Sequence, residues 1–237
     1  MDYKIRQIQF AIFPKNFSLS DKIKLATDLK IKTSNLFDGE PTIWSLPIDA
    51  PLEIPRIILP SKDGKYVCNI SLQRIDLLFN LSNEGDVDIA GNISLAKDTA
   101  GKIAGYFIND LGISIGRIGF VTTFIATTVS EANLFMKDTL LTKSKLVNRR
   151  NLRTLSVVVN DTDKIDAYEI SRIIQIGTLQ KPDRSESKSV LIMCDSNTLA
   201  EKFQDYNLSA ENIHTILDNV SASLIPEKLN ELFETIS

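Results

Sequence analysis

The stretch PRIILPSKDGKYVCNISLQRIDLLFN, residues 55–80, decides the fold class of this 237-residue chain. A first strand at Arg56–Leu59 is followed by an Asp-Gly turn within Pro60–Gly64, and Tyr66–Leu72 returns as the second strand of a hairpin. A further strand is expected at Arg74–Asn80. Successive strands joined by such short connections predict an antiparallel sheet.

The rest of the first half is predicted from apolar spacing and turn residues. Ser18, with Asp21 three residues later, is expected to begin a helix, and Ser82–Asn92 has the composition of a polar loop. Ser94 is then expected to cap a longer helix that ends at Gly112. Two more elements are predicted before the hairpin, a strand at Ile5–Phe13 and a short strand at Thr42–Leu46.

Two glycines lie inside the predicted helix that follows Ser94. Gly101 and Gly105 each cost roughly 1 kcal/mol relative to alanine in a helix interior. Close packing of the helix against a neighbouring element is the expected compensation.

The second half is predicted to follow the same order of elements. A long strand comes first, then a short helix capped by Ser130, three strands, and a helix capped by Ser209 that carries an apolar stripe. Pro226 begins either a second helix or the continuation of a kinked one. The four strands are expected at Ile113–Thr127, Thr154–Val159, Tyr168–Thr178 and Ser189–Cys194, and the apolar stripe at Ile213, Ile216, Leu217, Val220 and Leu224.

The expected fold class is therefore α+β, with antiparallel sheet and with helices on one face. One alternative is a duplicated β-α-β-β-β-α unit, with halves at residues 1–112 and 113–237 that can pack together as a single domain. The opening strands of the halves are alike, IRQIQF at residues 5–10 and IGRIGF at residues 115–120. The other alternative is one α+β domain without a repeat.

A resemblance to a known group supports this order of elements. The blocks at residues 55–59, 61–64 and 72–80, together with residues 115–120, resemble a sporadically distributed, uncharacterised bacterial protein family of similar length. Leu81 stands where that family often has tryptophan. The family has no assigned activity, so the resemblance implies a fold and no chemistry. Its sporadic distribution implies, by analogy, a place in a bacterial defence or mobile-element gene set.

Composition excludes several classes of protein. Hydrophobic residues make up 43% and charged residues 24% of the chain, which are globular values, and the net charge of −3 excludes a globally basic nucleic-acid binder. No apolar stretch is long enough for a membrane span, and Met1–Arg6 does not resemble a secretory signal. Cys68 and Cys194 lie in apolar runs and are expected to be buried. These features predict a cytoplasmic protein without a membrane partner.

The sequence contains no complete catalytic or metal-binding set. His214 is the single histidine, and Asp218 one helical turn later can reach it. Gly112–Gly116 matches a nucleophile elbow in letters but precedes a strand instead of a helix. The acidic runs Glu84–Asp88 and Asp161–Asp166 are interpreted as solvated turns. We therefore predict no catalytic residue, no cofactor and no metal.

One local feature is unusual in a chain that is acidic overall. Five basic residues occur within eleven positions without an acid among them, which is typical of a contact with phosphates or with an acidic partner. The segment contains no aromatic residue for base stacking, and a solvated connector is the alternative. The basic residues are Lys143, Lys145, Arg149, Arg150 and Arg153.

Three functions remain open from the sequence. The first is an intracellular, non-enzymatic binding protein that holds a protein partner or a second copy of itself. The apolar stripe from Ile213 to Ile236 is its expected packing or dimer surface, with packing in the core as the alternative. The second is a nucleic-acid-binding module that uses residues 143–153. The third is an enzyme of unknown class that acts through His214 or the acidic turns.

Overall fold

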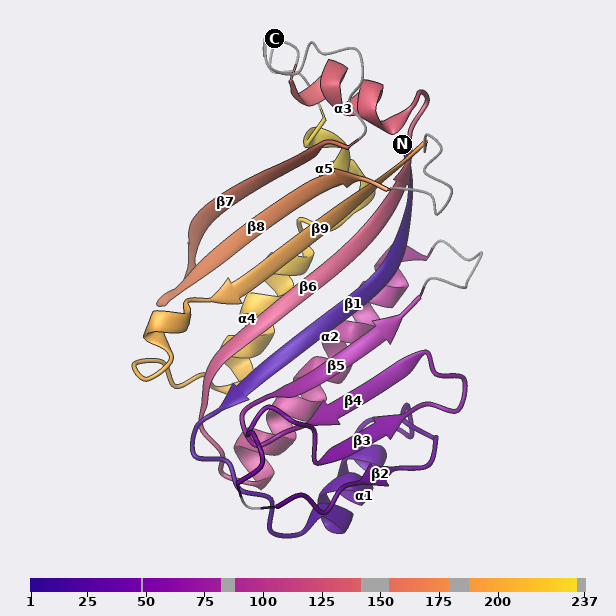
Figure 1. Ribbon diagram of the computed structural model, residues 1–237. Helices are drawn as coiled ribbons and strands as arrows, with labels where there is room; N and C mark the ends of the chain where they lie inside the picture. The colour runs from indigo at the N-terminus through magenta and orange to yellow at the C-terminus, as the bar shows by residue number, and fades with distance from the viewer. Residues whose placement is uncertain (48, 82–87, 142–153, 180–187, 234–237) are drawn as a thin grey trace.

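The computed structural model describes residues 1–47, 49–81, 88–141, 154–179 and 188–233. These residues form a nine-stranded sheet with the order β2-β3-β4-β5-β1-β6-β9-β8-β7 (Figure 1), and all neighbouring strands in it pair antiparallel. The strands are β1 (Asp2–Pro14), β2 (Thr42–Ile43), β3 (Ile57–Pro60), β4 (Tyr66–Ile70), β5 (Ile75–Asn80), β6 (Ile115–Thr127), β7 (Ser156–Ile165), β8 (Tyr168–Thr178) and β9 (Ser189–Thr198).

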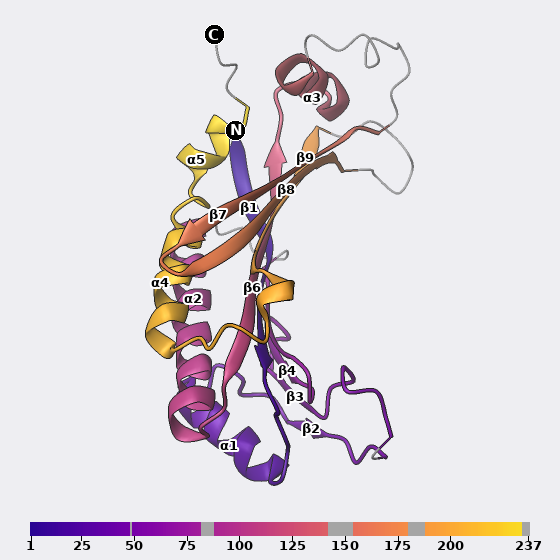
Figure 2. The same cartoon turned by 90° about the vertical axis from the view of Figure 1, so that its left-hand side faces the viewer.

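Helices cover one face of this sheet. Figure 2 shows α1 (Lys22–Lys32), α2 (Ile89–Gly105), α4 (Ala210–Ser221) and α5 (Pro226–Glu231) on the same side, whereas α3 (Ala132–Leu140) lies beyond the end of β6. A π-helix, η1 (Tyr106–Asp110), continues α2, and a 3-10 helix, η2 (Ala200–Lys202), follows β9. The predicted α+β class is confirmed, and the segment from Pro226 is a separate short helix.

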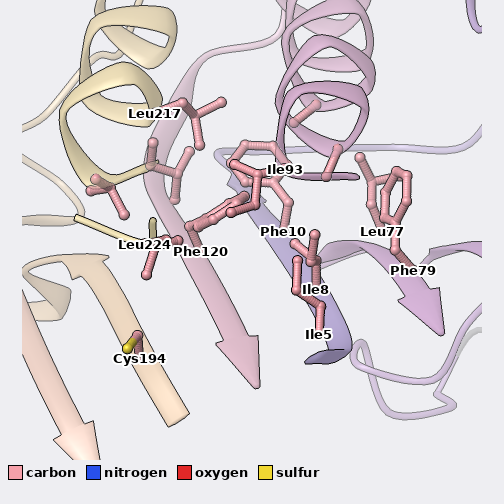
Figure 3. Packing of buried hydrophobic residues seen from close by; sticks show 14 of the residues in the cluster. Ile5, Ile8, Phe10, Leu77, Phe79, Ile93, Phe120, Cys194, Leu217 and Leu224 are labelled. Carbon is pink, nitrogen blue, oxygen red and sulfur yellow. The ribbon is translucent and has the colours of Figure 1, made fainter. Parts of the chain in front are cut away.

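The core lies between the sheet and these helices. Alternate residues of a strand point to opposite faces, so Ile8, Phe10 and Ile12 of β1 all point toward the helices and are fully buried. Figure 3 shows how side chains of β1, β5 and β6 meet those of α2 and of the α4 region.

The apolar stripe of α4 is part of this core. Ile213, Ile216, Leu217, Val220 and Leu224 are each at most 3% exposed. Of the later positions, Leu229 is 1% exposed, and Ile236 lies outside the described residues. Of the two interpretations of this stripe, core packing is therefore confirmed and a dimer surface is wrong for the described positions, because the sheet and α2 already cover them.

The two halves of the chain meet at the centre of the sheet, where β1 pairs with β6. Phe10 lies opposite Phe120, Gln9 opposite Val121 and Ala11 opposite Gly119, so a shift of 110 residues (from 10 to 120) maps this pairing onto itself. The last strand of each half, β5 or β9, lies next to the first strand of the same half, β1 or β6. The strand pairing thus agrees with the order predicted for two units, while their origin by duplication stays a prediction.

The first residues of the helices were predicted less accurately from the sequence than the strands. Asp21 caps α1 by accepting a hydrogen bond from the Lys24 amide at 2.9 Å, and Asp88 caps α2 by accepting one from the Gly91 amide at 2.8 Å. Ser18 and Ser94 therefore do not cap these helices, and the predicted loop at Ser82–Asn92 already contains the start of α2. Aspartate and serine are about equally good caps, so residue type alone does not choose between neighbouring candidates.

The second half gives one confirmed cap and one correction. Ser209 begins α4 with a capping box in which Asn212 is the reciprocal residue, as predicted for Ser209. Glu131, and not Ser130, occupies the cap position of α3, without a side-chain hydrogen bond.

The acidic run Asp161–Asp166 is not a turn over most of its length. Residues up to Ile165 belong to β7, which pairs continuously with β8, and only Asp166, with a φ of 53°, lies in the connecting turn. β7 is an edge strand with exposed residues, so its charged side chains stay in water and do not oppose strand formation.

Gly101 lacks the close neighbour that was expected of it. A Cβ atom at Gly101 would meet no heavy atom within 4 Å, and at Gly105 only the amide of Asn109 at 3.8 Å. We expect Gly101→Ala to raise the free energy of unfolding by about 1 kcal/mol, since alanine restricts the unfolded chain without a clash. Urea denaturation measures this gain, and a loss of stability would show that the helix needs glycine at this position.

Candidate functional site

The face of the sheet opposite α1, α2, α4 and α5, here called the open face, carries a cluster of charged residues. None of the α-helices in the described parts of the chain covers its central strands (Figure 2). The cluster lies on β1, β5, β6, β9 and the residue before β5, and we call it the Arg117 cluster. Its members are Phe13, Arg74, Asp76, Arg117, Asp195 and Asn197.

Strand alternation and register bring these residues together. Phe13 lies directly opposite Arg117 in the β1–β6 pair, so both side chains point to the open face. Asp76 lies opposite Ala11, and Asp195 opposite Val121, positions that themselves stand 110 residues apart (from 11 to 121). The two aspartates therefore occupy corresponding places on the two sides of the central strand pair.

Arg74 and Asp76 form a satisfied ion pair. The Nε of Arg74 donates to Oδ1 of Asp76 at 2.7 Å, and its Nη2 lies 2.6 Å from the same oxygen. Gln9 also donates to Oδ1 of Asp76, at 2.9 Å. The guanidinium of Arg74 lies 5.3 Å from the centre of the Phe13 ring, within the range of a cation–π contact.

Arg117 differs from Arg74 because it has no ionic partner within the part of the chain that the structure describes. Its guanidinium lies 4.6 Å from the centre of the Phe13 ring, and its Nη2 has one long hydrogen bond, 3.4 Å, to Oδ1 of Asn197. Its Nε is buried without a hydrogen-bond partner, and no ion pair of Arg117 occurs among the described residues. Burial lowers the pKa of Arg117 below its usual value; the charge of Asp195 opposes this change, as does that of Glu201, whereas the charge of Arg74 acts in the same direction as burial.

The carboxylate of Asp195 is the negative charge that acts most strongly on Arg117. The hydrogen-bond partner of Asp195, however, is Asn197. Nδ2 of Asn197 donates to Oδ1 of Asp195. Burial raises the pKa of the Asp195 carboxyl, while this hydrogen bond and the charge of Arg117 oppose the increase. Gly119 leaves the space that the Asn197 side chain fills, because a Cβ at Gly119 would overlap with it.

The sequence analysis missed this cluster entirely. Phe13 and Arg117 come from different halves of the chain and meet only because of the register between β1 and β6. A signal was present in the two similar opening strands, which, when paired antiparallel, place Arg117 of the second strand beside the end of the first. Without that register, Arg117 is an ordinary charged strand residue.

His214 lies on the exposed side of α4. Its Nε2 is 3.3 Å from Oδ2 of Asp218, as predicted from their spacing, and its side chain is 58% exposed. Asp218 also accepts a hydrogen bond from Lys97 at 2.5 Å, which joins α4 to α2. His214 and Asp218 thus form a contact within α4 at the surface, Lys97–Asp218 is the contact between helices, and neither brings a nucleophile to His214 among the described residues.

The cysteines and acids of the described chain form no metal centre. Cys68 and Cys194 are buried free thiols, as predicted, and burial raises the pKa of Cys194 to about 12. Within the described ranges no group of three histidine, cysteine, aspartate or glutamate residues is arranged to hold a metal ion. The acidic run at 84–88 lies outside those ranges except for Asp88, which caps α2.

A cavity of about 610 Å³ lies where the β1–α1 connection meets the first turn of α1 and the end of η1. Lys15, Lys24 and Tyr106 are among its polar lining residues, and each has a partner in the protein. Lys15 donates to the carbonyl of Gln204 at 2.8 Å, Lys24 to Asp28 at 2.7 Å, and the Tyr106 hydroxyl to Asp28 at 2.7 Å. Asp21 also lines the cavity, and its carboxylate accepts the Lys24 amide as the cap of α1, so these contacts hold the local fold together.

The predicted phosphate or partner contacts cannot be placed. Lys143, Lys145, Arg149, Arg150 and Arg153 all lie outside the described residues. Their role in binding nucleic acid stays a prediction from the sequence.

One property of the helices and two comparisons with known proteins bear on identity. The described helices include none that is long and apolar enough to cross a bilayer. No protein-family model and no curated protein matches the chain, so its function has to be argued from the geometry above.

Proposed function

We propose that the protein is an intracellular, non-enzymatic binding protein that holds a protein partner on the open face of its sheet. The observation that carries the proposal is Arg117, a guanidinium above the Phe13 ring with a buried Nε that has no acceptor. Leaving a buried donor without a partner costs about 1–3 kcal/mol. A partner carboxylate recovers this cost when the guanidinium turns on binding, because Nε is buried in the unbound chain.

The chemistry of the missing group follows from the geometry of arginine. A guanidinium offers donors in a planar fork that matches a carboxylate, and such charge-assisted pairs are among the strongest hydrogen bonds. Arg117 lies above the Phe13 ring, and Val121, four residues farther along β6, points to the same face of the sheet. The proposed anchor is therefore an acidic side chain of the partner, flanked by apolar residues.

Site-directed photocrosslinking tests this proposal in the native cell. A photoreactive amino acid at Val121, on the open face, is expected to give discrete adducts with one partner, whereas the same amino acid at the exposed Asn219 of α4 gives none. Arg117→Gln should weaken capture of that partner by tenfold or more, because losing one member of a buried charge pair costs about 2–5 kcal/mol. Lys164→Gln on the distant edge strand is the matched control.

Two outcomes would contradict the proposal. Equal adducts from Val121 and Asn219 would mean that no partner prefers the open face. Unchanged capture by the Arg117→Gln protein, with its melting temperature also unchanged, would mean that Arg117 does not anchor the partner.

A further inference from the structure

The two edges of the sheet differ in the strand that lies outermost and in how far it could pair with another strand. At one edge, β3 is paired with the two-residue strand β2, and the connection around β2 contains several prolines, which cannot extend a ladder of hydrogen bonds. At the other edge, β7 has ten residues and pairs only with β8 among the described residues. β7 contains no proline, and its register with β8 has no bulge.

The exposed side chains of β7 are apolar at one end. Val158 is 58% and Val159 is 54% exposed, whereas most valines in folded proteins are buried. Both are β-branched residues, which pack well against a similar residue on a neighbouring strand. A free backbone edge and exposed valines together form a surface for strand addition.

We propose that two copies of this chain pair through β7, antiparallel, with Val158 opposite Val158 of the partner subunit. In this register Val157 faces Val159 of the partner subunit, and Ser156 faces Asn160 of the partner subunit. Asp161 then faces Leu155 of the partner subunit, so no two acids of β7 lie directly opposite one another. A second copy is the occupant because the run Val157–Val159 is complementary to itself about Val158.

The geometry of the second copy follows from strand pairing. Residues directly opposite in an antiparallel pair point to the same face of a sheet. The helices of both copies therefore lie on one side of a continuous sheet, and both open faces lie on the other. The first half already shows such an addition, since β2 pairs antiparallel with β3 on the corresponding edge.

Mass in solution is the first test. Sedimentation of the full chain over a concentration series is expected to show a monomer at low concentration and twice that mass at high concentration. Val158→Lys should weaken this dimer tenfold or more, because it places two lysines opposite one another on the axis. Val129→Lys, at a position that is 91% exposed and away from β7, is the matched control and should leave the dimer unchanged.

A disulfide test reads the register directly. Residues opposite one another in an antiparallel pair have Cα atoms about 4.5–5.5 Å apart, which suits a disulfide. Oxidised Val158→Cys is therefore expected to form a covalent dimer, whereas Val159→Cys, which faces Val157 of the partner subunit, does so much less. The native cysteines do not interfere, because both are buried.

Three results would overturn the proposal. A monomer at every concentration shows that β7 does not self-associate. A dimer that Val158→Lys leaves intact shows that the chain associates through another surface. Equal crosslinking at positions 158 and 159 shows that the strands do not hold the stated register.

Discussion

Replacing either central phenylalanine should remove a large part of the stability of the protein. Phe10 is fully buried and Phe120 is 3% exposed, and they lie opposite one another beneath α2 and α4 (Figure 3). We expect Phe10→Ala and Phe120→Ala each to lower the free energy of unfolding by about 3–5 kcal/mol. Native domains have only about 5–15 kcal/mol in total, so urea denaturation should show much earlier midpoints.

The positions of Phe10 and Phe120 also predict how the losses in free energy of unfolding compare between the two variants. Both residues occupy the point about which the β1–β6 register is symmetric, so their losses should agree within about 1 kcal/mol, the scatter expected for similar cavities. Val129→Ala, at a position that is 91% exposed, is the control and should change stability by less than about 0.5 kcal/mol. A small loss for one phenylalanine and a large loss for the other would contradict this equivalence.

Local turn chemistry explains why the hairpin was predicted correctly. Gly64 adopts a φ of 71°, which glycine tolerates and other residues rarely adopt. Asp63 stabilises the same turn by accepting hydrogen bonds from Ser61 at 2.5 Å and from the Lys65 amide at 2.9 Å. Signals of this kind involve neighbouring residues only, so they can be recognised from sequence.

Features that depend on distant residues could not be predicted in the same way. The apolar stripe of α4 indicated a buried face correctly, but not whether the sheet or a second copy buries it. The acidic residues of β7 indicated a turn because charge is frequent in turns. They lie in a strand because pairing with β8 continues through them, and that pairing is invisible in the local composition.

The Arg117 cluster shows the same limit for function. Nucleophile elbows, metal-ligand sets and phosphate-binding loops can be recognised in a sequence because short spacings define them. Phe13 and Arg117 meet through strand register alone, and the significance of Arg117 is that its buried Nε lacks an acceptor. Only coordinates reveal an unsatisfied donor.

Arg56 should be the most important polar residue for the structure around β2. It is 5% exposed, and its guanidinium donates to three backbone carbonyls of the preceding connection, those of Ala50 at 3.2 Å, Pro51 at 3.2 Å and Ile54 at 2.9 Å. The same connection leaves Leu52 and Ile54 exposed by 52% and 40%, so few apolar contacts hold it in place. The Arg56 guanidinium therefore supplies much of what holds this segment, together with a backbone hydrogen bond from the Leu72 amide to the Leu52 carbonyl at 3.1 Å.

We expect Arg56→Met to destabilise the protein by about 2–4 kcal/mol. Methionine retains much of the buried volume, so the loss comes mainly from hydrogen bonds to a charged donor, each worth about 1.5–3 kcal/mol and not additive. Limited proteolysis should show faster cleavage within residues 49–55, because the carbonyls lose the group that orders them. Arg74→Met, which removes an arginine that is 39% exposed from the open face, is the matched control.

The comparison separates a local from a global role of Arg56. Arg74→Met should cost less than Arg56→Met, since Arg74 is 39% exposed and Gln9 still donates to Asp76, and it should leave cleavage at 49–55 unchanged. A cleavage rate in the Arg56→Met protein equal to that of the unchanged chain would mean that the connection is held without the guanidinium. Because Arg56 also pairs through its backbone amide with Ile70, at 2.7 Å, faster cleavage together with retained β3–β4 pairing identifies the side chain as the cause.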